Sequence, residues 1–96
     1  MTKQFCVYIL TNQARGTLYI GVTSSLPQRI AQHRGKLVAG FTAKYGLDQL
    51  MWYELHENAE SAIVREKQLK KWSRLWKIEL IERTNPDWRD LYTEIV

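Results

Sequence analysis

Residues 5–22 read FCVYILTNQARGTLYIGV and predict the first two strands of a sheet. FCVYIL (5–10) is apolar on both alternating faces, which is typical of a strand that is covered on both sides. TNQARGT (11–17) is rich in turn residues, and LYIGV (18–22) is a second short apolar run. Because parallel strands need a longer crossover, these two runs are predicted to form an antiparallel hairpin.

The rest of the chain predicts one more strand and several helices. After the hairpin, the pattern indicates a helix over 26–35 capped by Ser24 or Ser25, a loop over 36–48 and a strand over 50–55. A helix over 59–71 capped by Asn58 and a helix near 73–83 follow. The chain ends with a turn at Asn85-Pro86 and a short helix within 87–95. The order β-β-α-β-α-α predicts an α+β fold, a small three-stranded antiparallel sheet flanked by helices. We expect a single domain over residues 1–96.

Composition limits the class of protein. Of the 96 residues, 45% are hydrophobic, with four Trp and five Tyr, which is enough for one packed core. The one cysteine, Cys6, excludes an internal disulfide and a cysteine-rich zinc site, and it favours a reducing, cytoplasmic setting. No apolar run is long enough to span a bilayer and no signal peptide is visible, so we expect a soluble protein with no membrane partner.

Positive charge is concentrated in two segments. The net charge is +4; residues 1–48 hold six Lys or Arg against one acid, and residues 65–77 hold six against Glu66 alone. Two such segments could form one surface that faces phosphates, although charge alone favours ordinary solvated helix faces. The candidate nucleic-acid contacts are Arg34, Lys36, Lys44, Lys67, Lys70 and Lys71.

Two tyrosines share a face of the predicted hairpin. Along 18–22, Tyr19 and Gly21 point away from the face of the three aliphatic residues. If the hairpin is symmetric about residues 13 and 14, Tyr8 lies directly opposite Tyr19. The two phenols would then line a cleft beside a glycine that leaves room, or they would form an aromatic pair that only packs.

The first helix carries two polar residues along its apolar stripe. Leu26 and Ile30 mark its buried side, His33 falls on that side, and Arg29 lies at its edge. Arg29 and His33 are four residues apart and can reach one target. A lone inward histidine is usually a satisfied core residue, but an inward guanidinium needs an anion.

A carboxylate interrupts the apolar stripe of the long helical segment. The stripe around Glu66 consists of Ala59, Ala62, Ile63, Leu69 and Leu80, whereas Glu57 and Glu60 lie away from it. One explanation for a carboxylate at this position is an ion pair with Lys70, which would stabilise the helix by only about a few tenths of a kcal/mol. The other explanation is a single divalent ion, Mg²⁺ or Mn²⁺, held by this carboxylate and by phosphate oxygens.

These residues together suit phosphodiester hydrolysis. A metal polarises the phosphate, Arg29 stabilises the developing charge, and a phenol or imidazole takes the proton of water. A serine or cysteine hydrolase is less attractive, because Cys6 lies inside an apolar strand and no nucleophile elbow is present.

The ordered set of motifs resembles the GIY-YIG nuclease superfamily, in its small standalone bacterial branch related to the UvrC N-terminal domain. The residues that carry the resemblance, over roughly Phe5 to Leu91, are Cys6-Val7-Tyr8, Tyr19-Ile20-Gly21, Arg29 and His33 in LPQRIAQHR, GFTAKYG (40–46), Glu66 in REKQLKKW and the closing NPDWRDL (85–91). The resemblance implies a site on one sheet face. Tyr8 and Tyr19 would orient water or accept its proton, Arg29 would clamp the phosphate, His33 would be an auxiliary base or phosphate contact, and Glu66 would be the single metal ligand.

Two positions depart from the family pattern. Cys6 stands where the family name has glycine, and the asparagine that many members carry about three turns after the glutamate is replaced by SRLWKIEL. Asn85 is a weak substitute, so we leave that role unassigned.

The expected function is a divalent-metal-dependent endonuclease that hydrolyses phosphodiester bonds in nucleic acid; DNA is the favoured substrate, and RNA is left open. The alternative is a nucleic-acid-binding module without useful catalysis that acts with a partner protein. Since the chain has no appended DNA-binding domain, we expect weak structure-selective binding, a protein partner or a homodimer. Exposed tryptophans between residues 72 and 88 could support such a dimer, although core packing is their commoner use.

Overall fold

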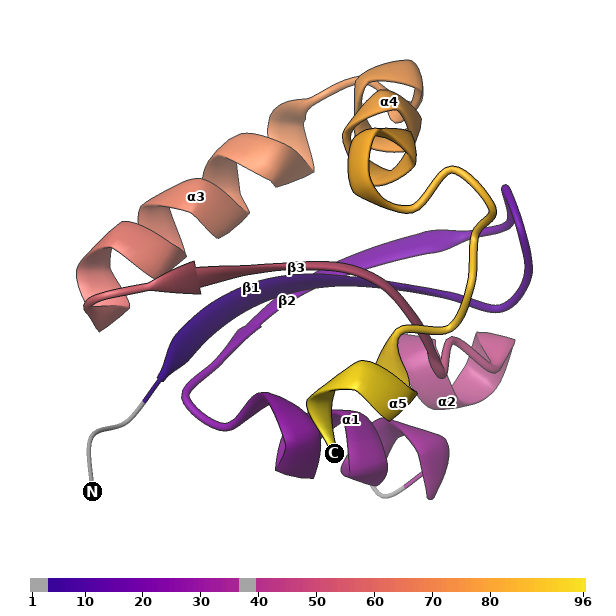
Figure 1. Cartoon of the computed structure of the whole chain (residues 1–96), viewed down its shortest axis with the longest axis horizontal. Coiled ribbons are helices and arrows are strands. Elements are labelled where there is room, and N and C mark those ends of the chain that lie inside the picture. Colours follow the sequence, from indigo (N-terminus) through magenta and orange to yellow (C-terminus); the bar gives the residue numbers. More distant parts are fainter. Residues whose placement is uncertain (1–3, 37–39) are drawn as a thin grey trace.

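The computed structural model describes residues 4–36 and 40–96 and shows an α+β fold (Figure 1). Its three-stranded antiparallel sheet consists of β1 (Phe5–Thr11), β2 (Leu18–Thr23) and β3 (Gln49–His56), in the order β2-β1-β3. β1 takes the central place because it is apolar on both faces, and all its residues after Phe5 are buried. The predicted hairpin, third strand and fold class are confirmed.

The register of the hairpin differs from the prediction. Tyr8 lies opposite Gly21, and not opposite Tyr19, so the predicted pairing is wrong by two residues. The turn closes through a hydrogen bond from the Gly16 amide to the Gln13 carbonyl at 2.9 Å, and the centre of the hairpin lies one residue later than expected. Since a shift of two residues preserves the face, both tyrosines still point to the same side of the sheet.

Helices cover both faces of the sheet (Figure 1). On one side lie α1 (Leu26–Arg34), α2 (Phe41–Tyr45) and α5 (Tyr92–Ile95); on the other lie α3 (Ala59–Lys71) and α4 (Arg74–Thr84). The core therefore has two parts. Val7, Ile9 and Ile20 pack with α3 and α4, whereas Cys6, Tyr8 and Leu10 pack with α1.

The predicted loop over 36–48 contains a helix. α2 is a single turn between Gly40, with φ of 102°, and Gly46, in the left-handed conformation with φ of 64°. Gly40 and Gly46 are the two caps of this short helix, and the left-handed C-cap is the position that glycine fills best. Residues 37–39 of the predicted loop lie outside the described residues.

The two long helices follow the prediction closely. The Asn58 side chain accepts a hydrogen bond from the Ser61 amide at 2.8 Å, which caps α3 as expected. The chain then breaks at Trp72, and the Ser73 hydroxyl caps α4 by accepting from the Trp76 amide. The break places Leu80 of the predicted stripe on α4 and its other members on α3. The predicted inward placement of Ile63 is wrong, because Ile63 is 42% exposed.

No helix within residues 4–36 and 40–96 is both long and apolar enough to cross a membrane.

Candidate active site

Tyr8 reaches across the edge strand of the sheet. Its ring lies over Gly21 of β2, so closely that a Cβ built on Gly21 would meet the Tyr8 hydroxyl and Cζ at 2.4 Å. β1 is the central strand and β2 is an edge strand of the sheet. The phenol of Tyr8 on β1 can therefore extend over β2 toward the edge of the sheet only at a position where β2 has no side chain. The space beside Gly21 is therefore occupied by the Tyr8 ring.

A chain of hydrogen bonds joins Tyr8 to two helices. The Tyr8 hydroxyl lies 3.1 Å from Nε2 of His33 in α1, and Nδ1 of His33 lies 3.1 Å from the hydroxyl of Thr42 in α2. All three side chains are buried, which confirms that His33 points inward. Thr42 was missed by the sequence analysis, because a threonine among glycines in a predicted loop carries no pattern that points to a partner nine residues earlier.

Three rings meet at this point. The ring of Tyr19, half-buried on β2, lies with its centroid 6.4 Å from that of Tyr8 and 5.8 Å from that of His33. The centroids of Tyr8 and His33 are 5.9 Å apart. The structure thus brings together the two tyrosines and the histidine, although the tyrosines are diagonal neighbours instead of a direct pair.

Arg29 extends from α1 at the edge of this cluster. It is half-buried, donates to Gln32 Oε1 at 3.5 Å and lines a hollow of about 350 Å³. The other residues around the hollow are Val22, Thr23, Ser24, Ser25, Gln28 and Gln32. Burial lowers the pKa of His33, and the positive charge of Arg29 lowers it further, so His33 is neutral at neutral pH.

Burial and neighbouring charged groups shift the pKa of the Tyr8 hydroxyl. Burial raises it to about 12, the nearby Arg29 guanidinium opposes the rise, and the charges of Tyr19 and Glu66 add to it. The phenol is therefore protonated at neutral pH. Arg29, Tyr19 and Glu66, from three different elements, all lie within electrostatic reach of this one hydroxyl.

Glu66 approaches from α3, on the other face of the sheet. Its side chain is only 16% exposed, and Lys70 Nζ lies 3.5 Å from its carboxylate, so the predicted ion pair with Lys70 is present. Ala62 and Leu69 on the same side of α3 are buried, which confirms a carboxylate within an apolar stripe. The carboxylate reaches the neighbourhood of Tyr8 because α3 packs against β1 and β2.

A divalent ion fits Glu66 in one specific way. Its carboxylate is a hard oxygen ligand that is largely buried and lies within electrostatic reach of the Tyr8 hydroxyl. Among residues 4–36 and 40–96, no three His, Cys, Asp or Glu side chains gather into a cage. An ion held here would therefore take one protein carboxylate and fill its remaining positions with water and phosphate oxygens, as Mg²⁺ does readily.

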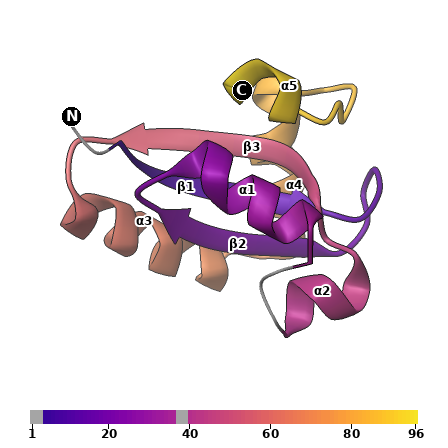
Figure 2. The ribbon, with the colours of Figure 1, turned by 90° about the horizontal axis from the view of Figure 1, so that it is seen from below.

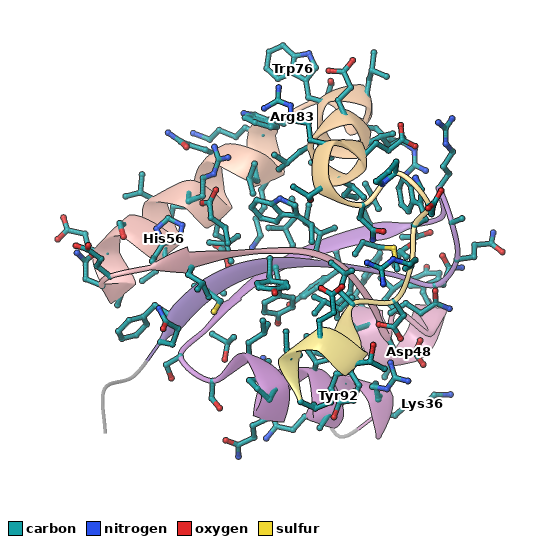
Figure 3. All side chains as sticks on the ribbon, viewed as in Figure 1. Lys36, Asp48, His56, Trp76, Arg83 and Tyr92 are labelled. Carbon is teal, nitrogen blue, oxygen red and sulfur yellow. The ribbon has the colours of Figure 1, made fainter. Side chains whose placement is uncertain are left out.

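The six basic candidates divide between the two sides of the sheet. Arg34, Lys36 and Lys44 lie on the side of α1 and α2, with Lys36 labelled at the lower side in Figure 3, and Lys67, Lys70 and Lys71 lie on α3. Arg34 is tied to Asp90 by a 2.6 Å ion pair and lies 4.6 Å from the centroid of Tyr92, so it holds the C-terminal segment. Lys36, Lys44, Lys67 and Lys71 are exposed.

Asn85, whose role was left unassigned, is a structural residue. It is buried, and its amide nitrogen donates to the carbonyls of Met51 at 3.1 Å and Arg89 at 2.8 Å. Its side-chain oxygen accepts from the Arg89 amide. Asn85 thus fixes the turn after α4 against β3.

Comparisons with known proteins identify the family of this chain. The family model described as the GIY-YIG catalytic domain matches residues 4–79. The chain is similar to a UPF0213 protein of Syntrophus aciditrophicus, with 35% identity over 88 residues that cover 91% of this chain and 98% of that protein. A UPF0213 protein of Clostridium perfringens is 37% identical over 75 residues, covering 78% and 80%. The solution NMR structure of a UPF0213 protein from Bacillus halodurans superimposes with a TM-score of 0.58 at 26% identity, covering 91% of this chain and 92% of that one.

Proposed function

The chain belongs to the GIY-YIG catalytic domain family, and from this premise we propose that it is a divalent-metal-dependent endonuclease that hydrolyses phosphodiester bonds in DNA. The observation that carries the proposal is the hydrogen-bonded chain Tyr8–His33–Thr42, with Arg29 and Glu66 in electrostatic reach of the Tyr8 hydroxyl. Such a group of residues provides a proton acceptor, with a cation and a metal-binding carboxylate in electrostatic reach of it.

In the proposed mechanism, Tyr8 and His33 move the proton of the attacking water. With Nδ1–H of His33 donating to Thr42, Nε2 is free to accept the hydroxyl proton of Tyr8. Water gives a proton to the Tyr8 oxygen as Tyr8 passes its own proton to Nε2. Because the pKa of Tyr8 is about 12, the two transfers are coupled and no free phenolate forms.

The remaining residues act on the phosphate. The water oxygen bonds to phosphorus, the bond to the leaving oxygen breaks, and the leaving oxygen takes a proton from solvent. Arg29 binds the non-bridging oxygens above the hollow that it lines, and Tyr19 donates its hydroxyl to the same phosphate or to the water. Glu66 would hold the Mg²⁺ or Mn²⁺ ion, which polarises the phosphate and stabilises charge on the leaving oxygen when it is bound.

The test is cleavage of supercoiled, branched and single-stranded DNA with Mg²⁺ or Mn²⁺. We expect wild-type protein to cut at least one substrate, and Glu66→Gln and Arg29→Ala to cut it at least about a hundredfold more slowly. Glu60→Gln is the matched control, because Glu60 is an exposed residue on the same helix. Cleavage that survives Glu66→Gln would contradict the proposal.

The ion pair between Glu66 and Lys70 favours a second candidate, a nucleic-acid-binding module that acts with a partner protein. At 3.5 Å, Lys70 already neutralises part of the charge that a metal would need. Steeply salt-dependent binding of DNA without any cleavage in Mg²⁺ or Mn²⁺ would support this candidate over the nuclease.

A further inference from the structure

The short helix α2 presents two aromatic side chains to solvent. Phe41 is 50% exposed and Tyr45 is 47% exposed, and they lie one turn apart on a helix of five residues. Their ring centroids are 4.7 Å apart, with the planes tilted by 49°. The two rings therefore form one continuous apolar face that the described part of the chain leaves uncovered.

This aromatic pair has a fixed place relative to the proposed active site. Thr42, which follows Phe41, is buried and lies 3.1 Å from Nδ1 of His33. The Leu47 amide donates to the Thr42 carbonyl at 2.9 Å, and the buried Leu47 anchors the end of α2 in the core. Figure 2 shows α2 beyond the C-terminal end of α1, the helix that carries Arg29 and His33.

Two lysines lie on the same side of the sheet as Phe41 and Tyr45. Lys44 Nζ lies 5.4 Å from the ring centroid of Tyr45, and Lys36 is exposed at the end of α1. No salt bridge within residues 4–36 and 40–96 involves either lysine, so both charges are available to phosphates. An apolar face of two rings with the Lys44 cation beside it suits a flat base attached to a charged backbone better than it suits the broad apolar surface of a protein partner.

We propose that Phe41 and Tyr45 stack on an unpaired base of the nucleic acid that the active site binds, so that the protein selects nucleic acid that carries single-stranded nucleotides. The proposal rests on the proposed function for the class of ligand. Every base has a flat face, so the stacking is tolerant of sequence, and it selects for unpaired structure. Lys44 contributes by holding the backbone phosphate of the stacked nucleotide.

The test measures binding without divalent metal, in EDTA, so that it does not depend on cleavage. Two fluorescently labelled probes are compared by anisotropy: a blunt duplex and the same duplex with an unpaired tail. We expect wild type to bind the tailed probe about fivefold more tightly or better, since stacking of one base is worth at least that factor. The double variant Phe41→Ala with Tyr45→Ala should lose this preference and keep its affinity for the blunt duplex.

Two control variants are available in the chain. Tyr45→Phe keeps the ring and should keep the preference. Trp76→Ala removes a tryptophan that is 54% exposed on α4, across the sheet from α2 and labelled at the top of Figure 3, and it should also keep the preference.

Equal binding of both probes by wild type, or a preference that survives the double variant, would overturn the proposal. Loss of the preference in Trp76→Ala would overturn it too, as would an equal loss of affinity for both probes in the double variant. A chain that prefers the tailed probe and never cuts DNA would refute the nuclease and leave this inference standing. A chain that cuts DNA but binds both probes equally would refute the stacking inference and leave the proposed nuclease standing.

Discussion

The ring of Tyr8 lies over Gly21 so closely that the position can accept no side chain: an added Cβ would meet the phenol oxygen at 2.4 Å. Gly21 is not in the left-handed region of backbone conformation, so the requirement is one of space. The glycine of the second strand is thus the reason that a tyrosine of the central strand can reach His33 at 3.1 Å.

We therefore expect Gly21→Ala to displace Tyr8 from His33. The overpacked methyl should lower the free energy of unfolding by about 1–3 kcal/mol. It should slow DNA cleavage by roughly a hundredfold, because catalytic groups tolerate little displacement. Urea unfolding and single-turnover cleavage measure the two effects. A folded Gly21→Ala protein with wild-type cleavage would show that Tyr8 does not act from this position.

Thr42 is predicted to be a positioning residue for His33. Thr42→Val keeps the shape and removes the hydroxyl, which leaves Nδ1 of the buried His33 without its partner. We expect a loss of about 1–3 kcal/mol in stability and roughly a tenfold slower cleavage. Thr42→Ser keeps a hydroxyl and should recover most of the rate. The pH dependence of cleavage is the decisive readout, because a purely structural role would leave its midpoint unchanged.

The lowered pKa of His33 predicts how stability depends on pH. The folded protein keeps His33 neutral below its ordinary pKa of 6.5, through burial and the charge of Arg29, whereas the unfolded chain takes up a proton there. Between the lowered pKa and 6.5 the unfolded state binds more protons, so the unfolding free energy must fall as pH falls through this window. His33→Gln should reduce this slope in urea unfolding series from pH 7.5 downward. Equal slopes in the two proteins would mean that His33 titrates normally.

Lys67 and Arg34 should behave differently although both were expected to contact nucleic acid. Lys67 is exposed on α3, and no ion pair within the described ranges involves it, so Lys67→Ala should reduce the slope of log affinity against log salt by about 1. Arg34 is tied to Asp90, so Arg34→Ala should lower the melting temperature with a smaller change in that slope. Binding isotherms at several salt concentrations separate the two. The opposite ranking would mean that Arg34 contacts the nucleic acid and that Lys67 does not.

Much of the fold follows from patterns that are local in the sequence. The double-sided apolar run of β1 predicted a strand that is covered on both faces, and Asn58 and Ser73 stand at the starts of the two long helices. The register of the hairpin could not be fixed in this way, because it depends on which turn hydrogen bonds form between residues 11 and 17. A shift of two residues leaves the apolar alternation unchanged, so the sequence pattern does not distinguish the two pairings.

The candidate site was predictable where periodicity placed a polar side chain against the core. His33 and Glu66 are of this kind, each lying among buried apolar neighbours of its own helix. Thr42 and the exposed aromatic pair of α2 were not, since a single helical turn between two glycines has too few residues to show a period. Their importance comes from contacts between elements that only the folded chain brings together.

The central claim, that Glu66 holds the metal of a phosphodiester-cleaving site, is tested most directly by a metal titration of single-turnover cleavage. Wild type, Glu66→Gln and the control Glu60→Gln are compared on one DNA substrate, with DNA binding in EDTA measured in parallel. We expect wild type and Glu60→Gln to cut with the same saturable dependence on Mg²⁺ or Mn²⁺. Glu66→Gln should bind DNA as wild type does and cut at least about a hundredfold more slowly at every metal concentration. An unchanged rate and metal midpoint in Glu66→Gln would contradict the account.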